Sequence, residues 1–226
     1  MIQTHRCIMR VYHFVCAKHG IENLCCRRLK IATINELNDP FELLAINLAD
    51  SKLRRALAKA KRQLAAKKGI LCFSRRRKNP VLWSHYAAKH TGLCLGFDIP
   101  SEHLIPVQYI GKRIAVEAEQ KLQLRDMDEA TVLKFLRTKY AHWHYEAEMR
   151  VVKPLKKCVL EEGLYFADFS DELVLKDVIV GANSMVSRSD LAKALGDLGQ
   201  HVRSVKARLA FKTFNVVSQH KSELWR

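Results

Sequence analysis

The segment from Ser51 to Phe97 contains 13 Lys and Arg residues and no Asp or Glu. The rest of the chain carries 26 basic and 23 acidic residues, so this segment supplies 13 of the 16 net positive charges. Like charges repel one another, and a field of this size is neutralised best by a polyanion or an acidic partner. We therefore expect the segment to form either a solvated helix face and a loop, or a contact surface for a polyanion or an acidic partner.

The first part of the segment has the pattern of an amphipathic helix. Apolar residues recur at helical spacing over residues 51–68, at Leu53, Leu57, Ala60 and Leu64, which is typical of one buried face. Asp50 or Ser51 is suited to cap the start of this helix, and Gly69 follows its end. A second basic cluster comes one short strand later. The residues expected to bind nucleic acid are Arg54, Arg55, Lys59, Lys61, Arg62, Arg75, Arg76, Arg77 and Lys78.

Nucleic acid is the partner that this charge favours most, with RNA or single-stranded DNA preferred. An acidic protein such as an antitoxin is the second choice, and an anionic membrane surface is a third choice that we do not adopt. Contacts to phosphates give affinity without sequence preference. Few aromatic residues that could stack on bases lie in the segment, so it indicates no sequence specificity.

The composition predicts a folded protein. With 226 residues, 48% of them hydrophobic, the chain can bury a core, and its length suits one domain of roughly 100–200 residues or slightly more. No apolar run approaches the ~20 residues of a membrane span, and the first residues lack the apolar centre of a signal peptide. The seven cysteines form no C-x-x-C pair, which argues against a zinc ribbon or a disulfide framework. We therefore expect a cytoplasmic protein with reduced thiols.

Strands and helices are interspersed without regular alternation, which predicts an α+β fold in a single domain over residues 1–226. Strands are expected at residues 10–15, 30–34, 70–74, 92–98, 146–153, 202–209 and 212–217, with a further element at 173–180. Helices are expected at residues 21–29, 41–48, 51–68, 81–89, 127–140 and about 187–198.

Four short clusters combine aromatic, polar and ionisable residues: Tyr12-His13, residues 38–42 (NDPFE), residues 83–92 (WSHYAAKHTG) and residues 143–150 (WHYEAEMR). In the last cluster Glu146, Glu148 and Arg150 lie at a period of two, so on a strand they share one face. Adjacent carboxylates repel, and one of them should have a raised pKa unless Arg150 compensates. Such pairs are disproportionately functional. The alternative is a structural ladder in which Arg150 neutralises both carboxylates.

Each cluster also has a structural interpretation. We expect Trp83 in the core, and the NDPFE turn can be a packing device that buries Phe41. A metal-dependent nuclease would combine Asp39 with Glu146 and Glu148. That hypothesis ranks low because Arg150 stands where such an enzyme has Lys, and no metal is expected. The chain contains no Walker loop, no G-x-G-x-x-G, no H-E-x-x-H and no G-x-S-x-G, which removes the enzyme classes that these motifs define.

The four clusters, in this order, resemble a bacterial family of uncharacterised proteins. The hallmarks of that family are an NDPFE turn, a strand ending in Ser, a W-S-H-Y-A…H-x-G block and a Y-E-x-E-x-R block. The resemblance extends from about Tyr12 to the L-K-D-V-I-V-G stretch. The basic helix, at about residues 50–69, is an insertion by this comparison.

The layout also resembles ADP-ribosyltransferases of the His-Tyr-Glu type, which implies a mixed β core with peripheral helices. The resemblance implies Glu148 as the catalytic carboxylate, with Glu146 and Tyr86 also assigned to catalysis. It implies NAD as the substrate, held by Tyr12, His13, Ser74, His85, Tyr86, Asn38 and Asp39. The chain departs from that family where Phe14-Val15 replaces the Gly-Thr that often follows the early His.

The chemistry of that family suits these residue types. Breaking the nicotinamide–ribose bond of NAD builds positive charge on the ribose, which a carboxylate such as Glu148 can stabilise. The aromatic ring of Tyr86 can stack on nicotinamide, His13 and Ser74 can hydrogen-bond the nicotinamide ribose or amide, and residues 75–78 can hold the pyrophosphate or guide the acceptor. The resemblance thus implies transfer of ADP-ribose to nucleic acid by a bacterial toxin or phage-defence effector.

Two other functions remain open at this stage. One is a non-catalytic module that binds nucleic acid or docks an antitoxin, with the Glu pair as scaffold. The other, less favoured, is the metal-dependent nuclease.

Overall fold

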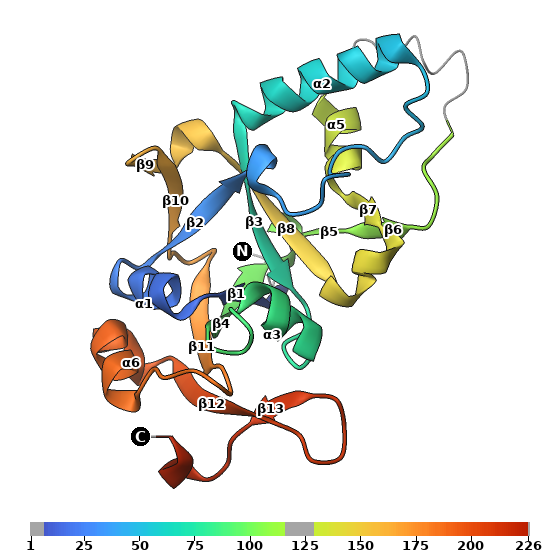
Figure 1. Ribbon diagram of the computed structural model, residues 1–226. Coiled ribbons are helices and arrows are strands. Elements are labelled where there is room, and N and C mark those ends of the chain that lie inside the picture. The colour runs from blue at the N-terminus through green and yellow to red at the C-terminus, as the bar shows by residue number, and fades with distance from the viewer. Residues whose placement is uncertain (1–6, 116–128, 226) are drawn as a thin grey trace. The chain divides into compact units, whose positions relative to one another are not determined.

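The structure is a computed structural model that describes residues 7–115 and 129–225 (Figure 1). The chain divides into two compact units. Unit 1 comprises residues 1–30, 73–104 and 167–226, and unit 2 comprises residues 31–72 and 105–166. The expectation of a single domain therefore stays a prediction, and each unit is described by itself.

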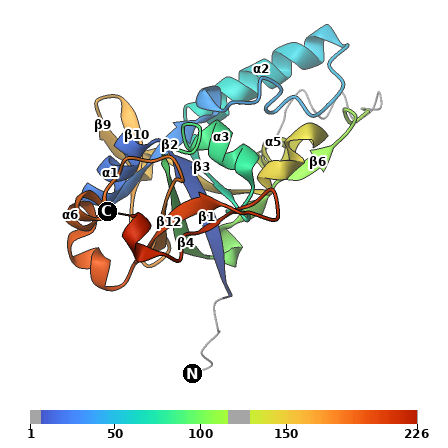
Figure 2. The ribbon, with the colours of Figure 1, turned by 60° about the horizontal axis from the view of Figure 1, so that its bottom comes forward.

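Unit 1 is built on a mostly antiparallel sheet. Its strands follow the order β13-β12-β11-β4-β1, and the last residues of β3 pair with β1. Only β11 and β12 run parallel to each other. The strand bounds are β1 (Ile8–Val15), β3 (Lys68–Ser74), β4 (Leu93–Pro100), β11 (Val174–Val180), β12 (Arg203–Leu209) and β13 (Val216–Ser218). The strands β12 and β13 form a hairpin whose loop extends beyond them, drawn in red in Figures 1 and 2.

Helices cover both faces of this sheet. On one face, α3 (Pro80–Tyr86) packs Trp83 against Phe14 and Cys94. On the other face, α1 (Ala17–Cys25) lies against α6 (Arg188–Leu195) and the sheet strand β4. The alternation of a strand explains this division, because neighbouring side chains point to opposite faces. Tyr12 and Phe14 therefore share the α3 face, whereas His13 points to the other.

Unit 2 combines shorter strands with one long helix. The strand β8 pairs with β3 and β5, β2 pairs with β3, and β6 runs parallel to β7. Its strand bounds are β2 (Arg28–Thr33), β5 (Ile105–Pro106), β6 (Gln108–Ile110), β7 (Thr138–Tyr140), β8 (Glu148–Pro154), β9 (Val159–Glu161) and β10 (Leu164–Asp168). Its helices are α2 (Ser51–Ala65) and α5 (Glu129–Leu136).

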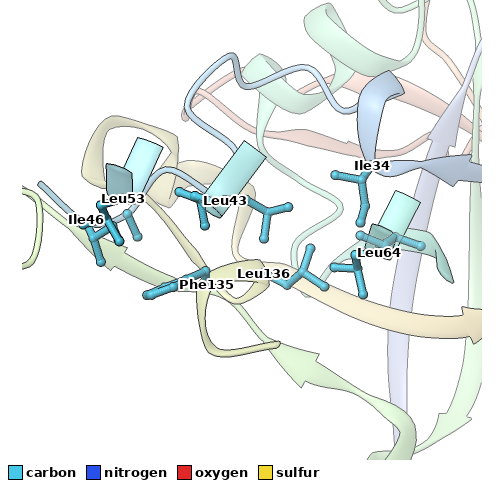
Figure 3. Packing of buried hydrophobic residues seen from close by; sticks show 10 residues of the cluster. Ile34, Leu43, Ile46, Leu53, Leu64, Phe135 and Leu136 are labelled. Carbon is cyan, nitrogen blue, oxygen red and sulfur yellow. The ribbon is translucent and has the colours of Figure 1, made fainter. Parts of the chain in front are cut away.

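The helix α2 confirms the amphipathic pattern. Asp50 caps its start by accepting hydrogen bonds from the backbone N–H groups of Lys52 and Leu53 at 2.7 and 3.0 Å, as an N-cap carboxylate does. Its apolar stripe is buried in a cluster that α5 completes with Phe135 and Leu136 (Figure 3). Burial of the whole stripe stabilises the helix, since each fully buried Leu contributes about 1.5–3 kcal/mol.

The fold class is confirmed at the level of a mixed α and β protein, with 33% helix and 36% strand. Other helix predictions were partly wrong. Residues 41–48 form turns and no helix, and residues 138–140 form β7 in place of a helix end. The start of the helix expected at 127–140 lies outside the described residues.

Helix α3 ends at Tyr86, earlier than residue 89, because Ala88, Lys89 and His90 have φ values of 46°, 55° and 70°. These left-handed conformations are incompatible with a continuing right-handed helix. Trp83 is fully buried, as expected, but Phe41 is exposed where burial was expected.

Smaller differences concern where individual helices and strands begin and end. The first helix and the strand after it lie at residues 17–25 and 28–33, a few residues earlier than predicted. The strand predicted at 212–217 is a loop up to residue 215, followed by β13. Within the described ranges no helix is both long and apolar enough to span a membrane.

Candidate functional site

A network of buried ionised side chains lies at the centre of unit 2. Arg150, only 1% exposed, binds two carboxylates with its guanidinium group. Its Nε and Nη2 donate to Oε1 and Oε2 of Glu148 at 2.8 and 3.1 Å. Its Nη1 and Nη2 donate to Oε1 and Oε2 of Glu42 at 2.5 and 3.1 Å, and Nη1 also donates to the carbonyl of Leu136. Bidentate pairing of this kind is the strongest geometry available to a guanidinium.

Lys139 joins the second glutamate to the same network. Its Nζ donates to Oε2 of Glu146 at 2.6 Å and lies 3.4 Å from Oε2 of Glu148. The ammonium group also lies 4.8 Å from the centre of the Trp143 ring, a cation–π contact. Lys139 was not predicted from the sequence as a site residue. Residues 127–140 were assigned to one helix, and a helix there gave no reason to pair Lys139 with the glutamates of residues 143–150.

The two glutamates meet by a different route from the one predicted. Glu148 begins β8 and shares a strand face with Arg150, as the period of two indicated. Glu146 instead ends a 3₁₀ helix, η4 (Ala141–Glu146), and Ala147 between them has a left-handed backbone with φ 44° and ψ 49°. The prediction that all three residues lie on one strand was therefore wrong for Glu146. The ammonium group of Lys139, on β7, lies between the carboxylates of Glu146 and Glu148 and links them.

Arg150 compensates for the burial of Glu148, so the pKa of Glu148 is not raised. Burial alone would raise the pKa of Glu148, but the charges of Arg150 and Lys139 and the hydrogen bond from Arg150 outweigh it and hold the pKa below its ordinary value. Burial alone would lower the pKa of Lys139, but the charges of Glu148 and Glu146 outweigh it and raise that pKa above its ordinary value. Opposite charges at hydrogen-bond distance thus favour the ionised forms of Glu148 and Lys139.

Two further groups contact Glu148. Its backbone N–H donates to the hydroxyl of Tyr109 at 2.8 Å, and burial raises the pKa of Tyr109 to about 12. Burial and the neighbouring charge of Glu148 raise the pKa of the Cys72 thiol well above its ordinary value. Both groups are therefore neutral at physiological pH.

The NDPFE turn contributes Glu42 to this network, a role that was not predicted from the sequence. Asp39 is buried, and its Oδ1 accepts a hydrogen bond from the backbone N–H of Phe41 at 2.9 Å. Asn38 is exposed. Among the described residues, no three His, Cys, Asp or Glu side chains are placed to hold a metal ion. Each carboxylate oxygen of Glu148 accepts a hydrogen bond from Arg150, which is the pairing expected of the structural ladder.

A basic cavity is the main hollow of unit 1 that contains predicted site residues. It has a volume of about 660 Å³ and is lined by Tyr12, Arg75, Arg76, Arg77, Lys78, Asn79, Pro80, Phe214 and Asn215. No Asp or Glu is among the described residues that line it. Burial raises the pKa of the Tyr12 phenol, which therefore stays neutral. The cavity thus presents several cations beside uncharged aromatic groups.

The backbone of the basic loop is held at three points. The backbone N–H of Arg76 donates to Oγ of Ser74 at 2.9 Å. The carbonyl of Arg77 accepts a hydrogen bond from Nε1 of the buried Trp83 at 2.7 Å. The carbonyl of Lys78 accepts one from the backbone N–H of Val216 at 2.8 Å. Ser74 pairs in register with Tyr12, so β1 and β3 together position the loop.

The other predicted residues of unit 1 lie elsewhere. His13 is on the opposite face of β1 from Tyr12, with its ring edge-on to Phe73 at 5.9 Å. His85 and Tyr86 contact each other on α3, with ring centres 6.1 Å apart. None of these three is among the described residues that line the basic cavity. The structure therefore joins Tyr12 and Ser74 to residues 75–78, but it brings none of the other predicted cofactor residues of unit 1 to this cavity.

The basic side chains of α2 have two kinds of role. Arg54 donates to the carbonyls of Leu48 and Ala49 at 2.6 and 2.8 Å, and Lys61 donates to the carbonyl of Glu42 at 3.3 Å. These two residues therefore stabilise the segment that precedes the helix. Arg54 is nonetheless exposed, as are Arg55, Lys59 and Arg62, whose side chains form no hydrogen bond with other described residues.

Phe214 and Asn215 are cavity residues that were not predicted from the sequence. They lie in the F-K-T-F-N segment, which was predicted as a strand. The available signal was a pair of Phe residues separated by two polar ones, a pattern that does not alternate as a half-buried strand does. Comparison with known proteins adds no assignment, because no family model matches the chain and no curated protein or solved structure is significantly similar to it.

Proposed function

We propose that this protein binds nucleic acid and that the basic cavity of unit 1 is its phosphate-binding site. The observation that carries the proposal is the line of four consecutive cations, Arg75 to Lys78, around one cavity with no acidic residue among its described lining. Phosphates are the natural counter-ions for such a surface, since Arg pairs with them in bidentate geometry and Lys as a point charge. A cavity of about 660 Å³ also lies in the range of nucleotide-sized sites.

Anchoring of the loop backbone supports the same function. Three hydrogen bonds hold the backbone of Arg76, Arg77 and Lys78. A site whose backbone is already ordered loses less conformational entropy on binding than a mobile loop does. The exposed cations of α2 in unit 2, Arg55, Lys59 and Arg62, offer a second surface for phosphates. Both surfaces act through charge, so binding should weaken as salt increases.

The test is to replace Arg75, Arg76, Arg77 and Lys78 together by Gln and to titrate a labelled 20-nucleotide RNA at several salt concentrations. We expect affinity to fall by about 100-fold or more near 0.1 M salt, because the four cations that neutralise phosphates at this site are removed. The slope of log affinity against log salt should become shallower by about 0.7 for each phosphate that the variant no longer neutralises.

The matched control removes the same number of charges from other exposed positions of unit 1, with Gln at Lys18, Lys30, Lys193 and Lys221. We expect the control to lose less than about 10-fold in affinity, because distant exposed charges are screened by salt. An equal loss in both variants would show that only the total charge matters, and would overturn the cavity as the site. Thermal unfolding of both variants verifies that they fold.

A second candidate function is transfer of ADP-ribose from NAD to the bound nucleic acid. The observation in its favour is that one cavity is lined by Tyr12, which the family resemblance assigns to NAD, and by residues 75–78, which can hold the pyrophosphate or guide the acceptor. In this reaction the nicotinamide–ribose bond breaks and nicotinamide leaves, and an O–H or N–H group of the acceptor forms the new bond to the ribose carbon and releases its proton to water. The carboxylate that would stabilise the positive ribose is assigned by the family resemblance alone, to Glu148 of unit 2.

Labelled NAD, incubated with RNA, single-stranded DNA, duplex DNA and cell protein in separate tubes, tests this candidate. If Glu148 is catalytic, Glu148→Gln should lower label transfer by about 100-fold or more and leave nucleic-acid affinity unchanged. Glu42→Gln is the matched control, because Glu42 binds the same guanidinium of Arg150. Absence of transfer and of nicotinamide release by the unmodified protein, or an equal loss in both variants, would contradict a catalytic Glu148.

A further inference from the structure

The loop that joins β12 to β13 exposes two phenylalanine rings almost completely. Phe211 is 92% exposed and Phe214 is 97% exposed. The loop itself is closed, since the backbone N–H of Ala210 donates to the carbonyl of Asn215 at 2.9 Å. The side-chain amide of Asn215 also donates to Oγ1 of Thr213 at 3.0 Å. Two nearly fully exposed rings on one turn offer an apolar contact surface to a partner.

The chemistry around the two rings is cationic. The guanidinium of Arg208 lies 4.7 Å from the centre of the Phe211 ring. Phe214 lines the basic cavity together with residues 75–78. The hairpin is joined to that loop by the hydrogen bond from Val216 to the carbonyl of Lys78. One surface therefore combines exposed aromatic faces with a row of cations.

We propose that this surface recognises single-stranded nucleic acid, with bases stacking on Phe214 and Phe211 while the phosphates contact residues 75–78. The inference rests on the proposed function and names its substrate class. Single strands are bound by proteins through this same combination of a basic groove and aromatic rings, and the rings accept any base because every base has a flat face. In a duplex the base faces are already stacked on one another, so only a single strand can use the two rings.

An anionic membrane or an acidic protein is a poorer match for this surface. The cavity beside Phe214 is hollow and is lined by the amide-bearing residues Asn79 and Asn215 as well as by cations. A nucleotide can enter a hollow of this kind, whereas a flat lipid surface cannot. The cations match the phosphates of the strand, and the rings match its bases.

The test uses the full chain with Phe211 and Phe214 both replaced by Ala. Three labelled probes are titrated: a 20-nucleotide single-stranded RNA, a 20-base-pair duplex, and a 20-unit abasic strand that keeps the sugar-phosphate backbone. We expect affinity for the single strand to fall by about 10- to 100-fold, and affinity for the duplex and the abasic strand to change less than about twofold. The control is Met185→Ala with Leu209→Ala, since both residues are exposed and apolar in the same unit.

The outcomes separate this inference from the proposed function. If the variant with Gln at residues 75–78 binds RNA as the unmodified protein does, the proposed function fails. If that variant loses binding but the double Phe variant does not, the proposed function stands and the stacking inference is overturned. An equal loss on the abasic strand would also overturn it. Binding to phosphatidylserine vesicles that depends on the two rings, with unchanged single-strand affinity, would assign the surface to membranes instead.

Discussion

Replacement of Arg150 by Met is expected to lower the free energy of unfolding by about 3–5 kcal/mol. The guanidinium is the shared partner of Glu42 and Glu148, and all three side chains are buried. The network has three carboxylates, from Glu42, Glu146 and Glu148, and two cations, from Arg150 and Lys139. Removal of Arg150 leaves three buried negative charges facing one ammonium. Met preserves the apolar volume, so the effect reports the charge.

The effect should depend on pH in a defined direction. In the unmodified protein the pKa of Glu148 is below its ordinary value of 4.5, so its stabilising contribution is complete above pH 4.5 and is lost as pH falls through the lower pKa of the folded state. Without Arg150, burial is no longer outweighed to the same extent, and the folded state of the variant binds a proton more readily. The difference between the two proteins should therefore be largest at neutral pH and shrink toward pH 4.

Urea unfolding at pH 7 and pH 4 measures both effects. Arg203→Met is the matched control, because Arg203 also pairs with a buried carboxylate, Asp177, but its own side chain is 55% exposed. Asp177 keeps a second partner in Arg10, and the control should cost less than about 1 kcal/mol. A loss at Arg150 no larger than at Arg203, or a difference that grows toward pH 4, would contradict the network as a source of stability.

Replacement of Gly92 by Ala is expected to destabilise unit 1 by about 3 kcal/mol. A Cβ at this position would overlap the carbonyl oxygen of Val15 and lie 3.0 Å from the backbone of Ala87. Both obstacles are backbone, which cannot rotate away as a side chain can. The backbone N–H of Gly92 donates to the carbonyl of Ala87 at 2.8 Å, and its carbonyl accepts from the N–H of Gly181 at 2.9 Å. The Gly of the H-x-G motif is therefore explained by packing: the backbone of Val15 and that of Ala87 come too close to residue 92 for a side chain.

Gly111→Ala is the control for this substitution, because a Cβ there meets nothing within 4 Å. We expect that variant to stay within about 0.5 kcal/mol of the unmodified protein in urea unfolding. The same stability for both variants would show that the segments around Gly92 separate without cost.

The parts of the fold that were predicted correctly are those with strong local patterns. The apolar stripe predicted over residues 51–68 and the capping carboxylate of Asp50 define α2, which ends three residues earlier than predicted, at Ala65, since helical spacing and a cap act within one or two turns. The apolar runs at residues 70–74 and 92–98 became the buried strands β3 and β4. Local patterns failed at residues 41–48, where Leu43, Ala45 and Ile46 fill the unit 2 core without forming a helix.

The candidate site divides in the same way. Glu148 and Arg150 were paired correctly from their spacing, because two residues on one strand face are neighbours in any sheet. The partners Lys139 and Glu42 were missed, since their contacts depend on how separate segments of unit 2 pack. The cavity likewise joins Phe214 to residues 75–78 through the β12–β13 hairpin, a pairing that no local pattern encodes.

The sequence by itself determined where the positive charge is concentrated, that the protein mixes helices with strands, and which residues carry a local helix or strand pattern. Tertiary structure alone decided that Glu148 is neutralised on both sides, that His13 and Tyr12 point to opposite faces of unit 1, and that two exposed rings adjoin the basic loop. The reason is physical: periodicity and charge act between residues close in the chain, whereas burial and ion pairing depend on segments that only folding brings together.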